Sequence, residues 1–480
     1  MALRPLALQK DINRERIVNL QKKINYIQVT KKKWILLVLF ILLVAGWFKF
    51  FYKTWTNESV PENADCIIAL DVKKITNTLI WNFITTPSQW KSGDWFSSDE
   101  EGKVSWDDMI SLPDYVFLFH LSGEPENAFY TVVEINDQDD FEKGLKQYGF
   151  EKTATGSFAS KQTGIEFIRN GNQLLVGNAA VENKEYLEQA SAALFGKKKF
   201  TSKNYLKRVI KNTGHFSLYG PMLKYLLNPV VTHITGNFDG SSVNFSMPVY
   251  TQEFFQFAKF DFQHSDSSML SMSFSMSYPA LKQIIPDSSL QSISKAVNFN
   301  IDSLLLPSNL YYQLDISGIY PRIDSAISYT YDDNFNPVEK VVVNKVNEPA
   351  FIFTVTGKEV TTIYDYWKRN GQLEYSNDSS MFTPIPFVKS YCSIKNKNIL
   401  TVASDGYKKT AQNRVIDNGI FLRILVTKIP PSLLIYLPAS IQKLLKNIES
   451  IEAFDSYEGK RCILNLQFNK KKNDQPLISF

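Results

Sequence analysis

The chain of 480 residues has few of the side chains on which enzyme chemistry most often depends. It contains three cysteines and four histidines, and no Cys-x-x-Cys motif. No two histidines have the spacing of a metal-binding pair. The sequence also lacks a G-x-S-x-G nucleophile turn and a phosphate-binding P-loop. We therefore predict no metal, no cofactor and no catalytic residue, and we expect a protein that is not an enzyme.

The cysteines are too few for a scaffold held together by disulfides, and their number is odd. Cys66, Cys392 and Cys462 each lie in an apolar run typical of a strand, which favours buried, inert thiols. A disulfide between Cys392 and Cys462 in an oxidising compartment is the alternative.

The basic residues gather at the N-terminus. Residues 1–33 hold nine Lys or Arg and two acidic residues, a balance of +7, while the whole chain carries +5. The remaining residues therefore sum to −2 and offer no basic surface for nucleic acid. The positive-inside rule places this leader in the cytoplasm.

A long apolar run, WILLVLFILLVAGWFKFFY, occupies residues 34–52. At about 1.5 Å per residue, a helix of this length spans roughly 28 Å, close to the thickness of the hydrocarbon core of a bilayer. We predict an uncleaved transmembrane helix, with the N-terminus in the cytoplasm and the body on the other side of the membrane. The residues expected to anchor the helix at the two interfaces are Trp34, Trp47, Tyr52, Lys31, Lys32 and Lys33.

Two other interpretations of the run stay open. Val44-Ala45-Gly46 fits a signal-peptide cleavage site, although more than thirty residues precede the apolar run. A buried core helix is the second, and the uncapped, basic and aromatic ends of the run disfavour it.

The body after the linker favours an α+β fold with a mostly antiparallel sheet. Hydrophobic residues make up 44% of the chain and aromatic residues 14%, enough for packed cores. Apolar alternation predicts strands at 66–72, 115–121, 129–135, 165–169 and 173–177. Helical spacing and caps predict helices at 73–84, 137–148, 182–194 and 202–212.

Segments in the first half of the body are similar to segments in the second half. FYTVVEINDQDDFEKGLKQYG from Phe129 is similar to FIFTVTGKEVTTIYDYWKRNG from Phe351, and RNGNQLLVGN from Arg169 to KNKNILTVAS from Lys395. ADCIIALDVKKI near the start is similar to SNLYYQLDISGI. We predict two tandem copies of one α+β unit, at 58–300 and 301–469, followed by a tail at 470–480.

An N-terminal anchor, then Val60-Pro61 with the opening ADCIIALDVKKI, and then a duplicated body resembles a known group of proteins. These are uncharacterised membrane-anchored envelope proteins of bacteria, of the bacteroidete type, in families of unknown function. The resemblance implies an anchor in the bacterial inner membrane and a body that is periplasmic or outside the cell, and it supplies no activity.

The candidate binding residues come from two features. Asp71 and Asp315 are expected at the same place in both copies, as paired carboxylates or as caps of the next turn. The acidic loop at 88–108 offers aromatic side chains that suit a sugar or a protein partner, or it is a plain surface loop. Its candidates are Trp90, Trp95 and Trp106.

The run SMSFSMSY at 271–278 alternates strictly, with Met272 and Phe274 on one face and serines on the other. This pattern predicts a strand whose apolar face is buried and whose serine face is wet. The apolar face is also a candidate lining for a ligand groove.

Three functions remain after this reading. The first is a single-pass envelope protein whose body binds or scaffolds a protein partner, with the bilayer as its other contact and an oligomeric state that the sequence leaves open. The second is a periplasmic lipid carrier or chaperone, and the third is a hydrolase whose site has no recognisable motif.

Overall fold

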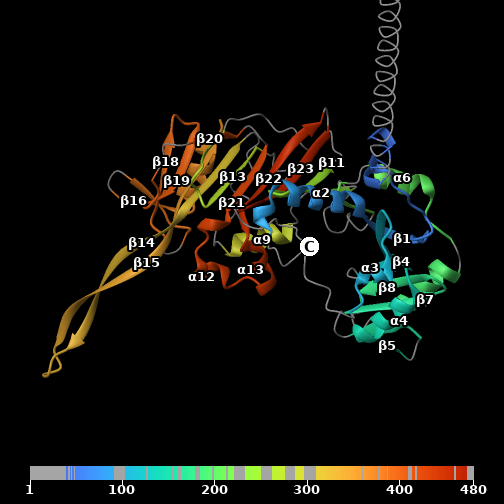
Figure 1. Cartoon of the computed structure of the whole chain (residues 1–480). Helices are drawn as coiled ribbons and strands as arrows, with labels where there is room; N and C mark the ends of the chain where they lie inside the picture. Colours follow the sequence, from blue (N-terminus) through green and yellow to red (C-terminus); the bar gives the residue numbers. More distant parts are fainter. Residues whose placement is uncertain are drawn as a thin grey trace, which may run out of the picture. The chain divides into compact units, whose positions relative to one another are not determined.

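The structure is a computed structural model in which the chain divides into two compact units, Met1–Trp55 and Thr56–Phe480. It describes residues 39–41, 44, 46–47, 49–90, 103–125, 128–153, 156–160, 164–178, 184–196, 199–211, 214–220, 233–249, 262–275, 287–296, 310–358, 360–376, 379–385, 388–408, 413–416, 419–458 and 461–472. Figure 1 shows the chain with its elements labelled.

Much of the predicted anchor lies outside the described residues, including Lys31–Lys33 and Trp34. The described residues between 39 and 51 are helical, and Trp47 and Tyr52 are about half exposed. Within the residues described, we find no helix long and apolar enough to cross a membrane. The leader at 1–33 and the membrane anchor stay predictions.

The second unit is a mixed α+β structure dominated by one large antiparallel sheet, which confirms the predicted fold class at that level (Figure 1). Hydrogen bonding places one set of strands side by side in a fixed order. These strands are β8 (Gln173–Asn178), β4 (Tyr130–Ile135), β3 (Tyr115–Leu121), β1 (Ala64–Asp71), β9 (Phe216–Tyr219), β10 (His233–Phe238) and β11 (Ser242–Val249).

A second set of strands follows the same connection order. Its strands are β19 (Ile399–Ser404), β15 (Pro337–Thr356), β14 (Tyr311–Tyr331), β13 (Leu270–Phe274), β21 (Ile420–Leu425), β22 (Ile448–Glu458) and β23 (Arg461–Lys470). The two sets join where β11 pairs with β23 along its whole length. The strand that comes first in the sequence is central in each set, β1 in the first and β13 in the second. On one side of it lies a hairpin and on the other a three-stranded meander.

Shorter strands extend both edges of the sheet. They are β5 (Glu151–Lys152), β6 (Phe158–Ser160) and β7 (Ile165–Asn170) beside β8, and β18 (Ser390–Lys395), β17 (Ser379–Phe382) and β16 (Leu373–Ser376) beside β19. The strand β2 (Ile110–Ser111) pairs with β4, and β12 (Phe262–Ser265) forms a separate pair with β20 (Asn413–Ile416).

The helices of the described body are short. They are α2 (Val72–Thr85), η1 (Pro87–Gln89), α3 (Trp106–Met109), α4 (Gln138–Gln147), α5 (Lys184–Ser191), η2 (Ala192–Gly196), α6 (Lys203–Lys211), α9 (Asp287–Ala296), α11 (Val360–Arg369), η3 (Val426–Lys428), α12 (Pro431–Leu434) and α13 (Ala439–Leu445). The strands and helices predicted between residues 66 and 212 are confirmed, within a few residues at their ends.

The prediction for the serine-rich strand was wrong about its serine face, which is buried and not wet. In β13, Ser271 and Ser273 are fully buried. On the other face Met272 and Phe274 are half-buried, and Phe274 packs on a core cluster as expected, while positions 276–278 lie outside the described residues. The reason is that β12 and β20 supply a small apolar cluster, with Phe262 and Ile416, that packs on Phe421 in the strand next to β13. Alternation predicts two faces, but not which face a distant segment covers.

Candidate functional site

The most distinctive surface is a two-stranded ribbon formed by the outer parts of β14 and β15. Residues 319–331 pair with residues 337–349 in thirteen antiparallel pairs, and among the described strands they pair with nothing else. Figure 1 shows this ribbon continuing past the end of the sheet. We call residues 319–349 the arm.

The base of the arm is fixed by a bulge and a buried carboxylate. The register of the strand pair shifts just before Gly318, whose φ of 154° lies in a region that side chains with a Cβ rarely adopt. Glu348 is 1% exposed and accepts hydrogen bonds from Tyr320 Oη at 3.1 Å and from Arg322 Nε at 2.5 Å. Gly406 lacks a side chain where the Tyr320 ring packs, so the ring sits directly against that turn.

The two faces of the arm differ in chemistry. Residues directly opposite in an antiparallel pair share a face, so the pairing assigns each side chain to one side. One face, which we call the apolar stripe, has seven large hydrophobic side chains that are 38–70% exposed. They are Ile319, Ile323, Ile327, Tyr329, Tyr331, Val341 and Val343.

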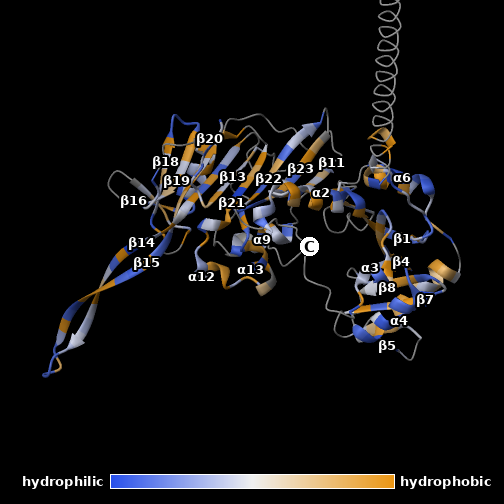
Figure 2. Cartoon of the chain, in the orientation of Figure 1, coloured by the Kyte–Doolittle hydropathy of each residue, from blue (hydrophilic) through white to orange (hydrophobic). Residues whose placement is uncertain are grey.

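The opposite face of the arm is more polar. It presents Arg322, Asp324, Ser328 and Lys340, interspersed with one alanine and three valines. An Arg322–Asp324 ion pair of 3.3 Å lies along it. Figure 2 shows how hydrophobic and hydrophilic residues share the ribbon.

The tip of the arm is an ordered turn. Asp332 Oδ1 accepts hydrogen bonds from the backbone N–H of Asn336 at 2.8 Å and of Asn334 at 2.9 Å. These bonds lower the pKa of Asp332. Phe335 adopts a positive φ of 62° and is 85% exposed, so the turn holds an aromatic ring out in solvent.

An uncovered stripe of this kind needs an explanation. A lone two-stranded hairpin is marginally stable in water, and contiguous exposed apolar patches of several hundred Å² usually mark interaction sites. The arm buries little of its own stripe, because its side chains point to solvent on both faces. The arrangement can therefore present an apolar surface to another molecule.

A second candidate is a buried polar cluster around His264. His264 Nδ1 lies 2.9 Å from Asp315 Oδ1, and Ser271 stands opposite Asp315 in the neighbouring strand. Within the described part of the chain, His264 Nε2 and the Ser271 and Ser273 hydroxyls have no hydrogen-bond partner. Acyl-transfer sites combine the same three residue types, a serine, a histidine and an aspartate. Here each of these side chains is at most 1% exposed, so the described arrangement offers a substrate no approach.

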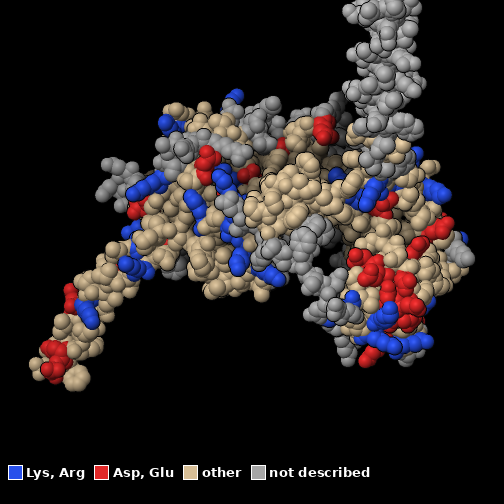
Figure 3. All heavy atoms as spheres, viewed as in Figure 1, with Lys and Arg blue, Asp and Glu red and all other residues tan. Residues whose placement is uncertain are grey.

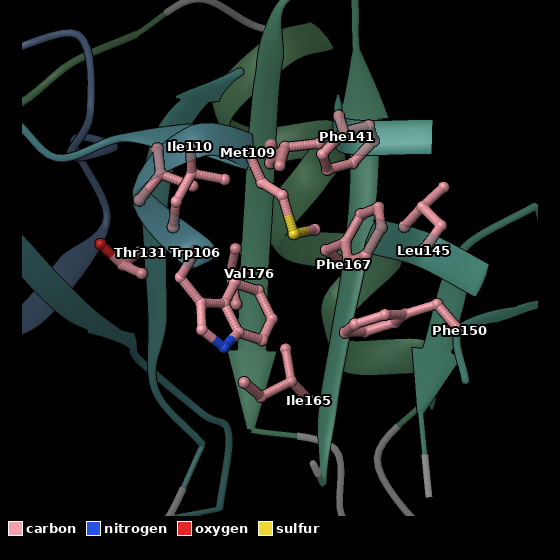
Figure 4. Close-up of a pocket in the computed structure, with 12 residues that line it drawn as sticks. Trp106, Met109, Ile110, Thr131, Phe141, Leu145, Phe150, Ile165, Phe167 and Val176 are labelled. Atoms are coloured by element: carbon pink, nitrogen blue, oxygen red, sulfur yellow. The ribbon is translucent and has the colours of Figure 1, made fainter. Parts of the chain in front are cut away.

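A third candidate is an apolar cavity of about 200 Å³ under α4 (Figure 4). Helices α3 and α4 form one wall, and strands β4, β7 and β8 form the other. Trp106 stands at its rim, 37% exposed, and stacks on Tyr148 with ring centroids 4.6 Å apart. The lining residues are Trp106, Met109, Ile110, Thr131, Val133, Phe141, Leu145, Phe150, Ile165, Phe167, Leu174 and Val176. The cavity suits an apolar group.

The two aspartates predicted as site residues do different things. Asp71 ends β1 and caps α2, because its Oδ1 accepts from the Lys74 backbone N–H at 2.8 Å. Asp315 instead lies inside β14 and binds His264 and Gln313. They do not occupy equivalent places, because a helix follows the first and the strand continues past the second.

The three tryptophans of the acidic loop are not brought together as a described site. Trp90 is 8% exposed and packs with Leu79 and Phe238, so it belongs to a core cluster. Trp95 lies outside the described residues. Trp106 lines the apolar cavity.

Sequence reasoning missed the arm. The signal was present, because Ile323, Ile327, Tyr329 and Tyr331 keep an alternating pattern up to the turn residues after 331. That pattern predicts a strand with one buried face, and only the pairing shows that the face is uncovered.

We compared the chain with protein-family models, with curated proteins and with solved structures, and no match was found in any of the three.

Proposed function

We propose that this protein is a binding or scaffold module of the bacterial cell envelope that docks a protein partner through its arm. The observation that carries the proposal is the apolar stripe, whose seven large hydrophobic side chains gather on one face of the arm and are exposed. In this proposal the segment at 34–52 anchors the body in the inner membrane, on the periplasmic side.

The unpaired backbone groups along the edges of the arm favour a protein partner over lipid. A two-stranded ribbon has two open edges with unpaired backbone N–H and C=O groups, and the hydrocarbon core of a bilayer does not tolerate such edges. Pro321, Pro337 and Pro349 remove donors from these edges and so oppose the addition of a further strand. Packing against the face of the ribbon is the remaining mode.

We also infer that the two sets of strands are copies of one unit. The support is the shared connection order, in which β1, β3 and β4 correspond to β13, β14 and β15. In this scheme the second copy begins near β13, earlier than the boundary at residue 300 expected from the sequence. The arm is then an extension of a hairpin that both copies possess.

Site-specific photo-crosslinking of the full chain in its native membrane tests the proposed function. A photoreactive residue at Ile327 lies on the stripe, and one at the neighbouring Ser328 lies on the opposite face and serves as the control. We expect a discrete protein adduct at 327 and little at 328. Equal adducts at both positions, or none at 327, would contradict a docking role for the stripe.

The apolar cavity favours a second function, that of a carrier for a small apolar group. Cavities with apolar linings bind small apolar molecules because no polar group holds water inside them. Titration of the full chain with a neutral apolar fluorophore, phenylnaphthylamine, is the test. We expect saturable binding that Val176→Phe abolishes by filling the cavity, whereas Ile327→Ala in the arm leaves it intact. Absence of saturable binding would remove this function.

A further inference from the structure

We infer that the apolar stripe binds the apolar stripe of a second copy of this chain. The two arms pack face to face and run in opposite directions. The inference rests on the proposed function, since it names the partner of the same arm. The argument comes from the two charged residues on the stripe, Lys345 and Glu339.

Both charges belong to β15 and point to the side of the stripe. Lys345 is opposite Ile323, near the base of the arm, and Glu339 is opposite Tyr329, near the tip. They are six residues apart, which corresponds to about 20 Å along the strand. Their midpoint is Val342, one residue from the middle of the paired part of the arm. Figure 3 shows charges of both signs along the arm, separated by uncharged surface.

A twofold axis at this midpoint, perpendicular to the strands and lying between the two ribbons, reverses one ribbon relative to the other. It leaves β15 facing β15 of the second copy, and it maps the level of Lys345 onto the level of Glu339. Each Lys345 then faces Glu339 of the second copy, and the pair is formed twice, as an isologous interface requires. Val341 faces Val343 of the second copy at the centre.

The alternative symmetric arrangement lacks this match. If the ribbons ran in the same direction, Lys345 would face Ile323 of the second copy, and Glu339 would face Tyr329. Both charges would then lose water without gaining an opposite charge, which is unfavourable. The charge pattern therefore selects the reversed arrangement.

The size of the stripe is sufficient for a specific dimer. Thirteen residue pairs at about 3.4 Å each make a ribbon roughly 40 Å long. Two such ribbons stacked face to face bury on the order of 1,000 Å² in total, at the lower limit of specific protein interfaces. We therefore expect a reversible dimer, not a permanent one.

Charge reversal tests the arrangement in the purified full chain, held in detergent, by sedimentation velocity over a range of concentrations. Lys345→Glu alone and Glu339→Lys alone each place like charges face to face twice. We expect each to weaken the dimer by about tenfold or more. The double variant K345E/E339K restores opposite charges and should recover the affinity. Lys340→Glu, on the opposite face, is the matched control and should change little.

Two results would overturn the inference. One is a monomer at every concentration for the unmodified chain. The other is a dimer that the single reversals leave intact or that the double variant fails to restore. If the chain is monomeric but position 327 still crosslinks to a different protein, the second copy is the wrong partner and the proposed function survives. If position 327 also gives no adduct, both are wrong.

Discussion

The hairpin β3–β4 and the hairpin β14–β15 stand at the same place in their two sets of strands, and they use their side chains in opposite ways. β3 and β4 are seven and six residues long, and all but one residue of β3 is buried. β14 and β15 are 21 and 20 residues long, and most of their outer halves are exposed. One hairpin stabilises its own chain, whereas the extension of the other offers its apolar side chains elsewhere.

This contrast separates folding from function within one topology. A strand that is covered on both faces contributes to the free energy of unfolding through burial. A ribbon that is covered on neither face contributes little to folding, so its regular apolar alternation needs another cause. Mutating each hairpin and measuring stability and association separately tests whether the two hairpins have these different roles.

The largest effect on stability is expected in the short hairpin. Phe119 in β3 is fully buried and its ring lies 5.8 Å from that of Tyr130 in β4. Phe119→Ala should lower the free energy of unfolding by about 3–5 kcal/mol, because it leaves a cavity. The matched change in the arm, Ile327→Ala, should stay within about 0.5 kcal/mol. Denaturant unfolding of the full chain in detergent measures both, and equal losses would contradict the contrast.

A smaller loss is expected at the base of the arm. Glu348→Ala removes the buried carboxylate that holds Tyr320 and Arg322, and should cost about 1–3 kcal/mol. Hydrogen exchange should speed up in the arm while β3 stays protected. Lys340→Ala, on the exposed opposite face of the arm, is the control and should change neither. A global rise in exchange would mean that the arm is part of the folding core.

A still smaller effect is expected on the pH dependence of stability, and it involves only the short hairpin. Burial lowers the pKa of His120, but the hydrogen bond and charge of Asp65, at 2.6 Å from Nδ1, outweigh it, so the pKa is raised overall. The folded state therefore binds more protons than the unfolded state above the ordinary pKa near 6.5.

The resulting stabilisation is fully present below that pH and is lost as pH rises through the folded-state pKa. We expect unfolding free energy to fall modestly over this window, and His120→Gln to remove the slope. Association through the arm should not share it, because residues 319–349 contain no histidine. An unchanged slope in His120→Gln would show that another group titrates.

Local elements could be predicted from the sequence and distant contacts could not. The strand at 115–121 has the bounds that its apolar pattern indicates. The pairing of β11 with β23 joins residues more than 200 positions apart, and no local pattern specifies such a register.

The candidate site was harder to predict because its chemistry depends on what covers it. Asp71 and Asp315 share a local motif, yet one caps a helix and the other lies beneath a histidine from a distant strand. The stripe of Ile323 and Ile327 has the alternation of a half-buried strand. Exposure is a property of the tertiary structure, so the sequence alone could not identify the arm as a surface.

Thiol labelling is the most direct test of the claim that the stripe is covered in the functional molecule. The native thiols give little background, because Cys66, Cys392 and Cys462 are buried and burial raises their pKa values to about 12, 12 and 11. Ile327→Cys and Ser328→Cys place a new thiol on each face of the arm. In the native membrane we predict that maleimide labels position 328 much faster than position 327. Equal labelling rates at the two positions would contradict the account.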